Sequence, residues 1–245
     1  MQPWQYETAT DLEQSVAERL KSFPREPDMT VYGLRIAAAS LIRLWLKAYH
    51  RLEILGRENL PTDGSFVVVA NHASHLDTLS ILSAMPLRRI HRVFPAAASD
   101  YFFSSVPRVL FSAILVNALP FDRQVDKKHS LEVCRRLLNN RGNVLIIFPE
   151  GTRSSTGEIG SFKLGIGLLV AGTELPVVPC RLDGAYEAWP KGALIPRPKR
   201  VHLTIGKPCS FAAEEPGSAG AAAVAQKLKA MVESLSLDKQ RTSEP

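Results

Sequence analysis

Two short apolar runs constrain the fold of this chain more than any other feature. Residues 66–70 read FVVVA, and residues 144–148 read VLIIF. Runs of about four to six aliphatic and aromatic residues without polar alternation are typical of strands buried on both faces of a sheet. Because both faces of such strands must be covered, the chain is predicted to be an α/β protein whose largely buried sheet is flanked by helices.

From residue 51 onward, strand patterns alternate with helix patterns. The expected strands cover residues 51–55, 66–70, 90–96, 116–121, 144–148, 177–181 and 201–205, and the expected helices cover residues 77–85, 127–139, 163–171 and 221–235. A linker is expected at residues 212–220. The predicted organisation is an N-terminal helical segment (1–50), an α/β domain (51–211) and a linker with a C-terminal helix (212–245).

The N-terminal segment is expected to contain a short helix at residues 10–23 and a longer one at residues 29–50. A spacing of about 100° per residue places Leu34, Ala37, Leu41, Leu44, Trp45, Ala48 and Tyr49 in one arc, with Arg35, Ser40, Arg43 and Lys47 opposite. A basic amphipathic helix of this kind suits a membrane interface. It suits packing against the following domain equally well.

Neither a signal peptide nor a clear transmembrane helix is expected. The first residues lack a basic start followed by an apolar run, and the longest candidate span, residues 29–46, is interrupted by Arg35 and Arg43. Any membrane contact is therefore expected to be peripheral. Three cysteines without metal-like spacing argue against a disulfide framework and for a reducing compartment, which places the protein on the cytoplasmic face of a membrane.

The formal net charge of +6 favours anionic partners, such as phospholipid headgroups, a phosphorylated substrate, coenzyme A or an acidic carrier protein. The basic clusters are Arg88, Arg89 and Arg92; Lys127 and Lys128; Arg135 and Arg136; and Arg197, Lys199 and Arg200. Solvated surface charge is an equally good interpretation of any one cluster. Nucleic-acid binding is not expected, because the chain lacks a recognisable motif or a basic–aromatic stripe for it.

The first candidate site is Asn71-His72-Ala73-Ser74-His75-Leu76-Asp77, directly after the FVVVA run. If the chain turns there and a helix begins near Asp77, the carboxylate can reach back to the His72 imidazole. The carboxylate would fix the tautomer of His72, which could then act as a general base toward a hydroxyl. Two alternatives stay open: a capping Asp77 beside a structural histidine, and a metal site made by His72, His75 and Asp77. No metal is expected, because no cysteine pair supports such a site.

The second candidate site, residues 148–154, reads FPEGTRS after the VLIIF run. Gly151 lets the backbone approach an anion, Thr152 and Ser154 offer hydroxyls, and Arg153 matches the geometry of a phosphate. Glu150 would bond an acceptor hydroxyl or orient Arg153. Further cations are Lys163, just beyond this loop, and Arg123, at the end of the strand expected at residues 116–121. A surface turn with an ion pair is the alternative interpretation.

Taken together and in this order, four segments resemble the phospholipid and glycerol acyltransferases related to 1-acylglycerol-3-phosphate acyltransferase. NHASHLD matches the family's first block, LPFDR is similar to the second with Asn117 where glycine is common, FPEGTRS matches the third, and Val177-Val178-Pro179 resembles the fourth. The resemblance covers roughly residues 51–208. It implies an α/β fold with a mixed sheet and an N-terminal helical extension.

The resemblance also implies direct acyl transfer from a thioester, acyl-CoA or acyl-carrier protein, to the hydroxyl of a lysoglycerolipid, without a cofactor. His72 would be the base and Asp77 its partner. The substrate-binding residues would be Asn71, Arg123, Glu150, Gly151, Thr152, Arg153, Ser154, Lys163 and Pro179. The default acceptor is 1-acylglycerol 3-phosphate; glycerol 3-phosphate, other lysophospholipids and a lyso-aminolipid are alternatives. An acyl thioesterase or a non-catalytic lipid-binding protein are rival functions.

Overall fold

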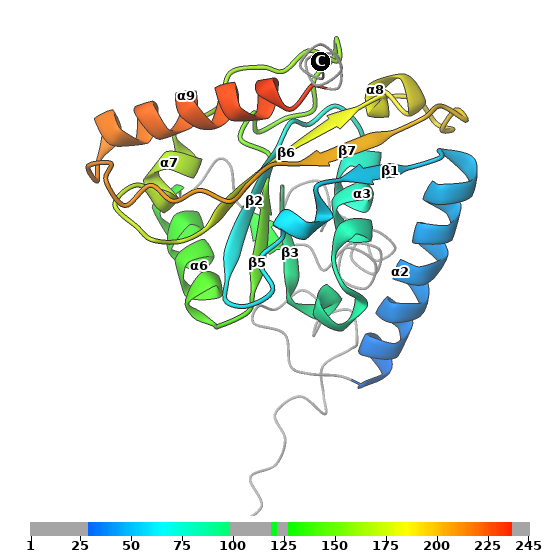
Figure 1. The fold of residues 1–245 in the computed structure, drawn as a ribbon, viewed down its shortest axis with the longest axis horizontal. Coiled ribbons are helices and arrows are strands. Elements are labelled where there is room, and N and C mark those ends of the chain that lie inside the picture. Colours follow the sequence, from blue (N-terminus) through cyan, green and yellow to red (C-terminus); the bar gives the residue numbers. More distant parts are fainter. Residues whose placement is uncertain (1–28, 99–118, 122–126, 237–245) are drawn as a thin grey trace, which may run out of the picture.

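A computed structural model describes residues 29–98, 119–121 and 127–236 (Figure 1). The strands are β1 (Glu53–Leu55), β2 (Phe66–Ala70), β3 (Val93–Ala98), β4 (Leu119–Phe121), β5 (Val144–Ile147), β6 (Val177–Asp183) and β7 (His202–Ile205). The α-helices are α2 (Met29–Tyr49), α3 (Leu76–Ala84), α6 (Lys127–Asn139), α7 (Gly165–Val170), α8 (Ala185–Ala188) and α9 (Ser218–Ser234), and the 3₁₀ helices are η1 (Arg57–Asn59) and η2 (Leu87–Arg92). The helix expected at residues 10–23 lies outside the described residues.

The described strands form one mixed sheet in the order β1-β7-β6-β2-β5-β3-β4. All neighbouring pairs are parallel except β6 and β7, which are antiparallel. Strand β2 therefore lies in the middle, with parallel neighbours on both sides. Because parallel strands end on the same side, β2, β5 and β6 all end at one edge of the sheet, which we call the carboxyl edge. Ligands of open α/β sheets bind at this kind of edge.

Helices cover both faces of the sheet, as the apolar runs predicted. Every residue of β2 is buried, and its side chains alternate between two clusters. Val68 packs into a cluster with α2 and α3, and Val67 and Val69 pack into a cluster with α6, α7 and α9. Figure 1 shows α3 and α2 on one side of the sheet and α6, α7 and α9 on the other. The predicted fold class is confirmed.

Helix α2 packs against α3 and η2 through the face that carries its arginines. Arg35 is 3% exposed, and the Arg43 guanidinium donates to the main-chain oxygens of Leu82 and Met85 at the end of α3. The last carbonyls of a helix lack partners within the helix, so a cation there supplies hydrogen bonds and complements the helix dipole. The apolar arc therefore faces outward, with Leu41 67% exposed.

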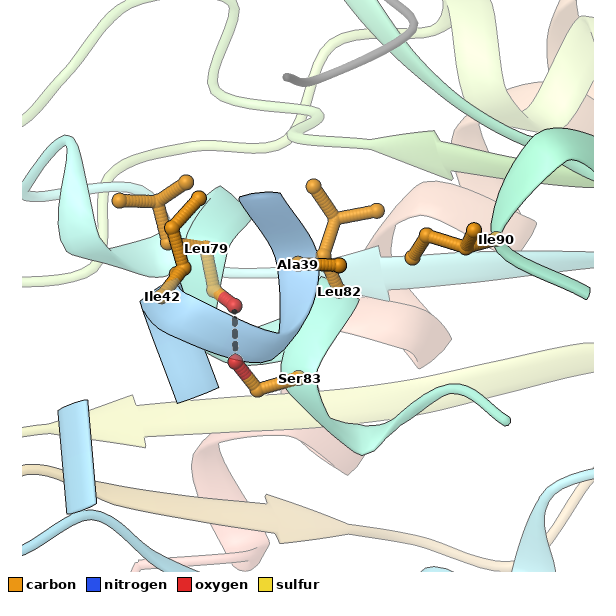
Figure 2. Close-up of a pocket in the computed structure, with 6 residues that line it drawn as sticks. All are labelled: Ala39, Ile42, Leu79, Leu82, Ser83 and Ile90. Atoms are coloured by element: carbon orange, nitrogen blue, oxygen red, sulfur yellow. Dashed lines mark hydrogen bonds between the residues drawn. The ribbon is translucent and has the colours of Figure 1, made fainter. Parts of the chain in front are cut away.

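A small apolar crevice remains where α2 meets α3 and η2. Its lining residues are Ala39, Ile42, Leu79, Leu82, Ser83 and Ile90 (Figure 2). The Ser83 hydroxyl donates to the main-chain oxygen of Leu79 within α3, 2.8 Å away. The only polar side chain of the lining is thus already paired, and the crevice is a packing feature of the helix interface.

Two elements begin three residues away from the predicted position. Strand β3 begins at Val93 rather than residue 90, because residues 87–92 form the 3₁₀ helix η2 after Pro86. Helix α9 begins at Ser218, inside the expected linker, and its buried residues join the cluster around Val67.

None of the described helices meets the length and hydropathy required to span a bilayer.

Candidate active site

Two loops leave the carboxyl edge side by side. Residues 71–75 follow β2, and residues 148–164 follow β5, the parallel neighbour of β2. The register pairs Val69 with Ile147, so the two strands end at the same level. This pairing explains how two segments far apart in the sequence come together at one place.

The first loop forms the expected pair between His72 and Asp77. His72 Nδ1 lies 2.9 Å from Asp77 Oδ2. The same carboxylate oxygen accepts hydrogen bonds of 2.7 Å from the main-chain N–H groups of Ala73 and Ser74. Asp77 lies in the first turn of α3 and is fully buried, whereas the side chain of His72 is 18% exposed. A buried carboxylate held in this way fixes the imidazole and leaves Nε2 for a proton.

Two further side chains fix the shape of this loop. The Asn71 amide both donates to the main-chain oxygen of Leu182 (2.9 Å) and accepts from its N–H (2.8 Å). The Ser74 hydroxyl donates to the main-chain oxygen of Trp189 (2.8 Å) and accepts from the N–H of Leu76. Both side chains are buried. Asn71, expected to bind substrate, therefore ties the loop after β2 to β6.

Glu150 makes two hydrogen bonds that the sequence did not predict, and its expected contact with an acceptor hydroxyl stays a prediction. Its Oε1 accepts from the main-chain N–H of His72 (2.7 Å), and its Oε2 accepts from the N–H of Gly160 (3.0 Å). Both oxygens are thus used by the chain itself, rather than orienting Arg153. Burial raises the pKa of this carboxyl, and the hydrogen bonds from Gly160 and His72 lower it. Glu150 consequently joins the two loops.

The His72 ring is held from a second direction by Phe148. The two rings stack with their centroids 4.1 Å apart and an interplanar angle of 17°. In addition, the main-chain N–H of Ser154 donates to the main-chain oxygen of His72 (2.7 Å). The base candidate therefore has a fixed position relative to the loop after β5. Phe148 was expected only as the end of a strand; a ring-stacking partner has no signal in the sequence.

The middle of the second loop carries cationic and hydroxyl groups that the chain does not fully use. Gly151 has φ +72°, and a Cβ there would come 2.5 Å from Lys163 Nζ, so the Lys163 side chain lies over the loop. Arg153 Nη1 is buried and has no hydrogen-bond partner among the described residues. Thr152 is exposed. The Ser154 hydroxyl accepts from the N–H of Gly157 (3.0 Å) and so shapes the turn.

Three other residues were singled out in the sequence. Arg123 and Asn117 lie outside the described residues. Pro179 is buried in β6, where its ring packs against Gly206, and its role in shaping a pocket stays a prediction.

His75 lies on the side of the loop nearest Trp189, with the ring centroids 5.5 Å apart. Burial is the main cause that lowers its pKa to about 4, and the positive charge of Arg153 contributes to the same shift. His75 is therefore neutral at neutral pH. Within the described residues, no group of three or more histidine, cysteine or acidic side chains is placed to hold a metal ion.

Comparison with known proteins identifies the family. A family model described as Acyltransferase matches residues 51–183, more than half of the chain and the span that contains both loops. The chain belongs to this acyltransferase family.

The relatives of this acyltransferase-family chain carry consistent names. A 1-acyl-sn-glycerol-3-phosphate acyltransferase from Chlamydomonas reinhardtii is 34% identical over 71% of this chain and 52% of its own length. The chloroplastic enzyme LPAT1 of Arabidopsis thaliana, named in the same way, is 30% identical over 62% of this chain and 43% of its own length. The chain thus spans about half the length of the curated relatives it matches.

A solved structure shares the fold of this acyltransferase-family chain over most of both molecules. The crystal structure of the 1-acyl-sn-glycerophosphate acyltransferase PlsC from Thermotoga maritima has a TM-score of 0.62 and 26% sequence identity. The match covers 84% of this chain and 80% of the other.

Proposed function

We propose that this protein transfers a fatty acyl group from a thioester to the free hydroxyl of a lysoglycerolipid, most simply 1-acylglycerol 3-phosphate. The observation that carries the proposal is the His72–Asp77 pair beside a loop whose Arg153 has a buried N–H group without a partner among the described residues. The names of the relatives support the same reaction and acceptor. The product would be phosphatidic acid.

His72 is the proposed general base. With Nδ1 held by Asp77, Nε2 takes the proton from the acceptor hydroxyl as its oxygen attacks the thioester carbonyl. The new ester bond forms as the carbon–sulfur bond breaks, and the proton held by His72 passes to the departing thiolate. A thioester is already an activated acyl donor, so positioning and proton transfer are the main tasks of the protein.

The loop after β5 is the proposed site for the phosphate of the acceptor. Arg153 and Lys163 supply positive charge. Gly151 allows the backbone to approach the phosphate closely, and Thr152 offers a hydroxyl group. Arg123 is a further candidate from the sequence. The stacked His72 and Phe148 rings and the Glu150 hydrogen bonds hold this loop next to the base, so phosphate binding would place the hydroxyl near Nε2.

Direct attack is favoured over a covalent acyl-enzyme. The Ser74 hydroxyl is buried and engaged in two hydrogen bonds, so it is poorly placed as a nucleophile. Burial raises the pKa of the Cys134 thiol to about 12 and also raises the pKa of Cys180. A nucleophilic cysteine needs the opposite shift, toward the thiolate. The donor is accordingly proposed to be acyl-CoA or acyl-carrier protein, attacked without an intermediate on the chain.

Peripheral attachment to the cytoplasmic face of a membrane is part of the proposal. The outward arc of α2 presents Leu34, Leu41 and Leu44, each at least half exposed. An exposed apolar stripe on a helix with a basic last turn suits the interface of a bilayer. A lysolipid acceptor resides in that interface, so attachment would bring the protein to its substrate.

The experiment is acyl transfer from labelled acyl-CoA and labelled acyl-carrier protein to a panel of lysolipids and glycerol 3-phosphate, with His72→Ala in parallel. The expected result is label in phosphatidic acid, lost in the variant. Label in another phospholipid would show that the acceptor is a different lysolipid from the proposed 1-acylglycerol 3-phosphate. Release of label only as free fatty acid would overturn the proposal in favour of a thioesterase, and lipid binding without turnover would favour a non-catalytic lipid-binding protein.

A further inference from the structure

The loop between α8 and β7, residues 189–201, exposes two large aliphatic side chains. Leu194 is 94% exposed and Ile195 is 76% exposed, whereas Leu41 on α2 reaches 67%. Aliphatic side chains exposed singly need no explanation, but two adjacent ones at the tip of a loop form a small apolar patch. The acyl-transfer reaction as proposed uses neither of them.

The base of this loop is held firmly beside the active site. Pro190 forms a β-bridge with Ser74, two residues from His72. The indole N–H of Trp189 donates to the main-chain oxygen of Ala193 (2.8 Å), which closes a turn directly before the apolar tip. These contacts hold the loop in one conformation, and this conformation exposes the side chains of Leu194 and Ile195.

The far end of the loop is held by the last turn of α2. The Tyr49 hydroxyl donates to the main-chain oxygen of Pro196 (3.1 Å). The main-chain N–H of Val201 donates to the oxygen of His50 (3.1 Å), and His50 Nδ1 lies 3.3 Å from the oxygen of Lys199. In Figure 1 the loop before β7 accordingly lies near the C-terminal end of α2. The apolar tip is therefore close to the helix whose outward arc is also apolar.

Basic residues flank the apolar tip in the sequence. Lys191, Arg197, Lys199 and Arg200 are all exposed, and residues 190–201 contain no acidic residue. The cluster of Arg88, Arg89 and Arg92 differs, because Arg89 is already used within the fold. Its guanidinium donates to the main-chain oxygens of Pro61, Gly64 and Gly142. The cluster at residues 197–200 is thus one that remains available to an anionic partner.

We infer that the loop 189–201 is a second membrane-binding element, whose aliphatic tip enters an anionic bilayer while its basic residues contact lipid phosphates. An apolar tip flanked by exposed cations matches the interface of such a bilayer, where aliphatic side chains leave water and cations meet headgroups. An acidic protein would satisfy the cations and leave Leu194 and Ile195 in water. The inference goes beyond the proposed reaction and does not depend on it.

The position of the loop has a consequence for the active site. The loop follows β6, so it lies at the carboxyl edge with His72 and the loop after β5. Contact through both α2 and this loop would fix two points of the protein on the bilayer. The carboxyl edge would then face the bilayer, which contains the lipid acceptor, rather than bulk water.

The test is sedimentation of the full chain with sucrose-loaded vesicles, either of phosphatidylcholine alone or of phosphatidylcholine mixed with phosphatidylglycerol. Leu194→Ser combined with Ile195→Ser is expected to weaken partitioning onto mixed vesicles by about tenfold or more, because two buried aliphatic side chains are lost. Leu55→Ser, an exposed leucine of β1 on another part of the surface, is the control and is expected to change nothing.

The charges are tested separately with Arg197→Gln combined with Lys199→Gln. Partitioning onto mixed vesicles is expected to fall about fivefold per charge, with little change on phosphatidylcholine alone and with a smaller effect at high salt. The control, Arg141→Gln with Lys207→Gln, removes two exposed charges at the opposite edge of the sheet. Unchanged melting temperatures show that the variants are folded.

Equal partitioning of the wild-type chain and the loop variants would overturn the inference, whether or not acyl transfer is found. Two other outcomes would replace the bilayer with a different binding partner for this loop. Binding to purified acyl-carrier protein that is lost in the charge variant, without vesicle binding, would identify an acidic protein partner. Dimers in sedimentation velocity that are lost in the apolar variant, without vesicle binding, would identify a second copy of the chain.

Discussion

The loops after β2 and β5 lie side by side, yet the hydrogen bonds within the chain use their polar groups to different degrees. In the loop after β2, Asp77 Oδ2 accepts from His72 and from two backbone N–H groups. In the loop after β5, Arg153 Nη1 has no partner among the described residues, and Thr152 is exposed. Asp77 Oδ1 is buried without a hydrogen-bond partner among the described residues, but the His72 ring already has its partner in Asp77 Oδ2. The second loop, in contrast, has a cation and a hydroxyl left for a ligand.

This difference matches two separate chemical tasks. A general base must have a fixed tautomer and position before substrate arrives, so its partners belong to the fold. A binding site must keep donors available, because a donor already used by the chain has nothing left to offer an anion. Glu150 connects the two tasks, since its carboxylate accepts from His72 and from Gly160.

The largest expected effect comes from removing the proposed base. His72→Ala should lower kcat by about 10²–10⁴-fold, the usual contribution of general-base catalysis. The fold should persist, although the melting temperature is expected to fall, because the variant loses the contacts of the His72 ring with the buried Asp77 carboxylate and with Phe148. Initial rates with saturating donor and acceptor measure the effect. Retention of the wild-type kcat would remove His72 from the base role.

Arg153→Ala should act on the acceptor rather than on proton transfer. Loss of a charged hydrogen bond to the acceptor phosphate is expected to raise the acceptor KM by about tenfold or more. The measurement is the acceptor dependence of the rate at saturating donor. Arg141→Ala, an exposed arginine at the opposite edge, is the matched control. An acceptor KM equal to that of the wild type would contradict phosphate binding by Arg153.

Glu150→Gln tests the connection between the loops through stability. A glutamine keeps one acceptor oxygen but presents an NH₂ group toward one of the two backbone N–H donors, so one buried hydrogen bond is lost. The free energy of unfolding in urea should fall by about 1–3 kcal/mol. Glu158→Gln, an exposed residue of the same loop, should have no measurable effect. Equal stability of the two variants would show that the Glu150 hydrogen bonds contribute little.

The last expected effect concerns the dependence of stability on pH. Burial lowers the pKa of His75 to about 4 in the folded protein, against about 6.5 in an unfolded chain. Between these values the unfolded state binds more protons, so stability falls as the pH decreases from about 6.5 to about 4. His75→Gln should lose less stability over that window in urea titrations. An identical loss in both proteins would exclude His75 as a source of it.

Much of the fold could be predicted because the sequence pattern matches local structure directly. The run FVVVA is strand β2, and residues 127–139 form helix α6, both with the predicted bounds. The start of β3 was wrong because Ile90, although apolar, lies in a 3₁₀ helix and is buried there. The outward arc of α2 was also ambiguous from sequence. Periodicity finds two faces of a helix, but only the hydrogen bonds of Arg43 to α3 decide which face packs.

The candidate site was predictable to a different degree in its two loops. The spacing of His72 and Asp77 within one short segment was enough to predict their contact, because the geometry is local. The role of Glu150 was not, since its partners, His72 and Gly160, are backbone groups brought together by strand pairing. The same holds for the stacking of Phe148 on His72. Interactions across the carboxyl edge depend on register, which local patterns do not specify.

The division of tasks between the two loops is tested most directly by one set of rates. The kcat/KM of the wild-type chain, His72→Ala and Arg153→Ala is measured with 1-acylglycerol 3-phosphate and with the matching monoacylglycerol, which lacks the phosphate. We predict that His72→Ala lowers kcat/KM for both acceptors, and that Arg153→Ala lowers it only for the phosphate-bearing one. An equal loss with both acceptors in Arg153→Ala would contradict the assignment of the loop after β5 to phosphate binding.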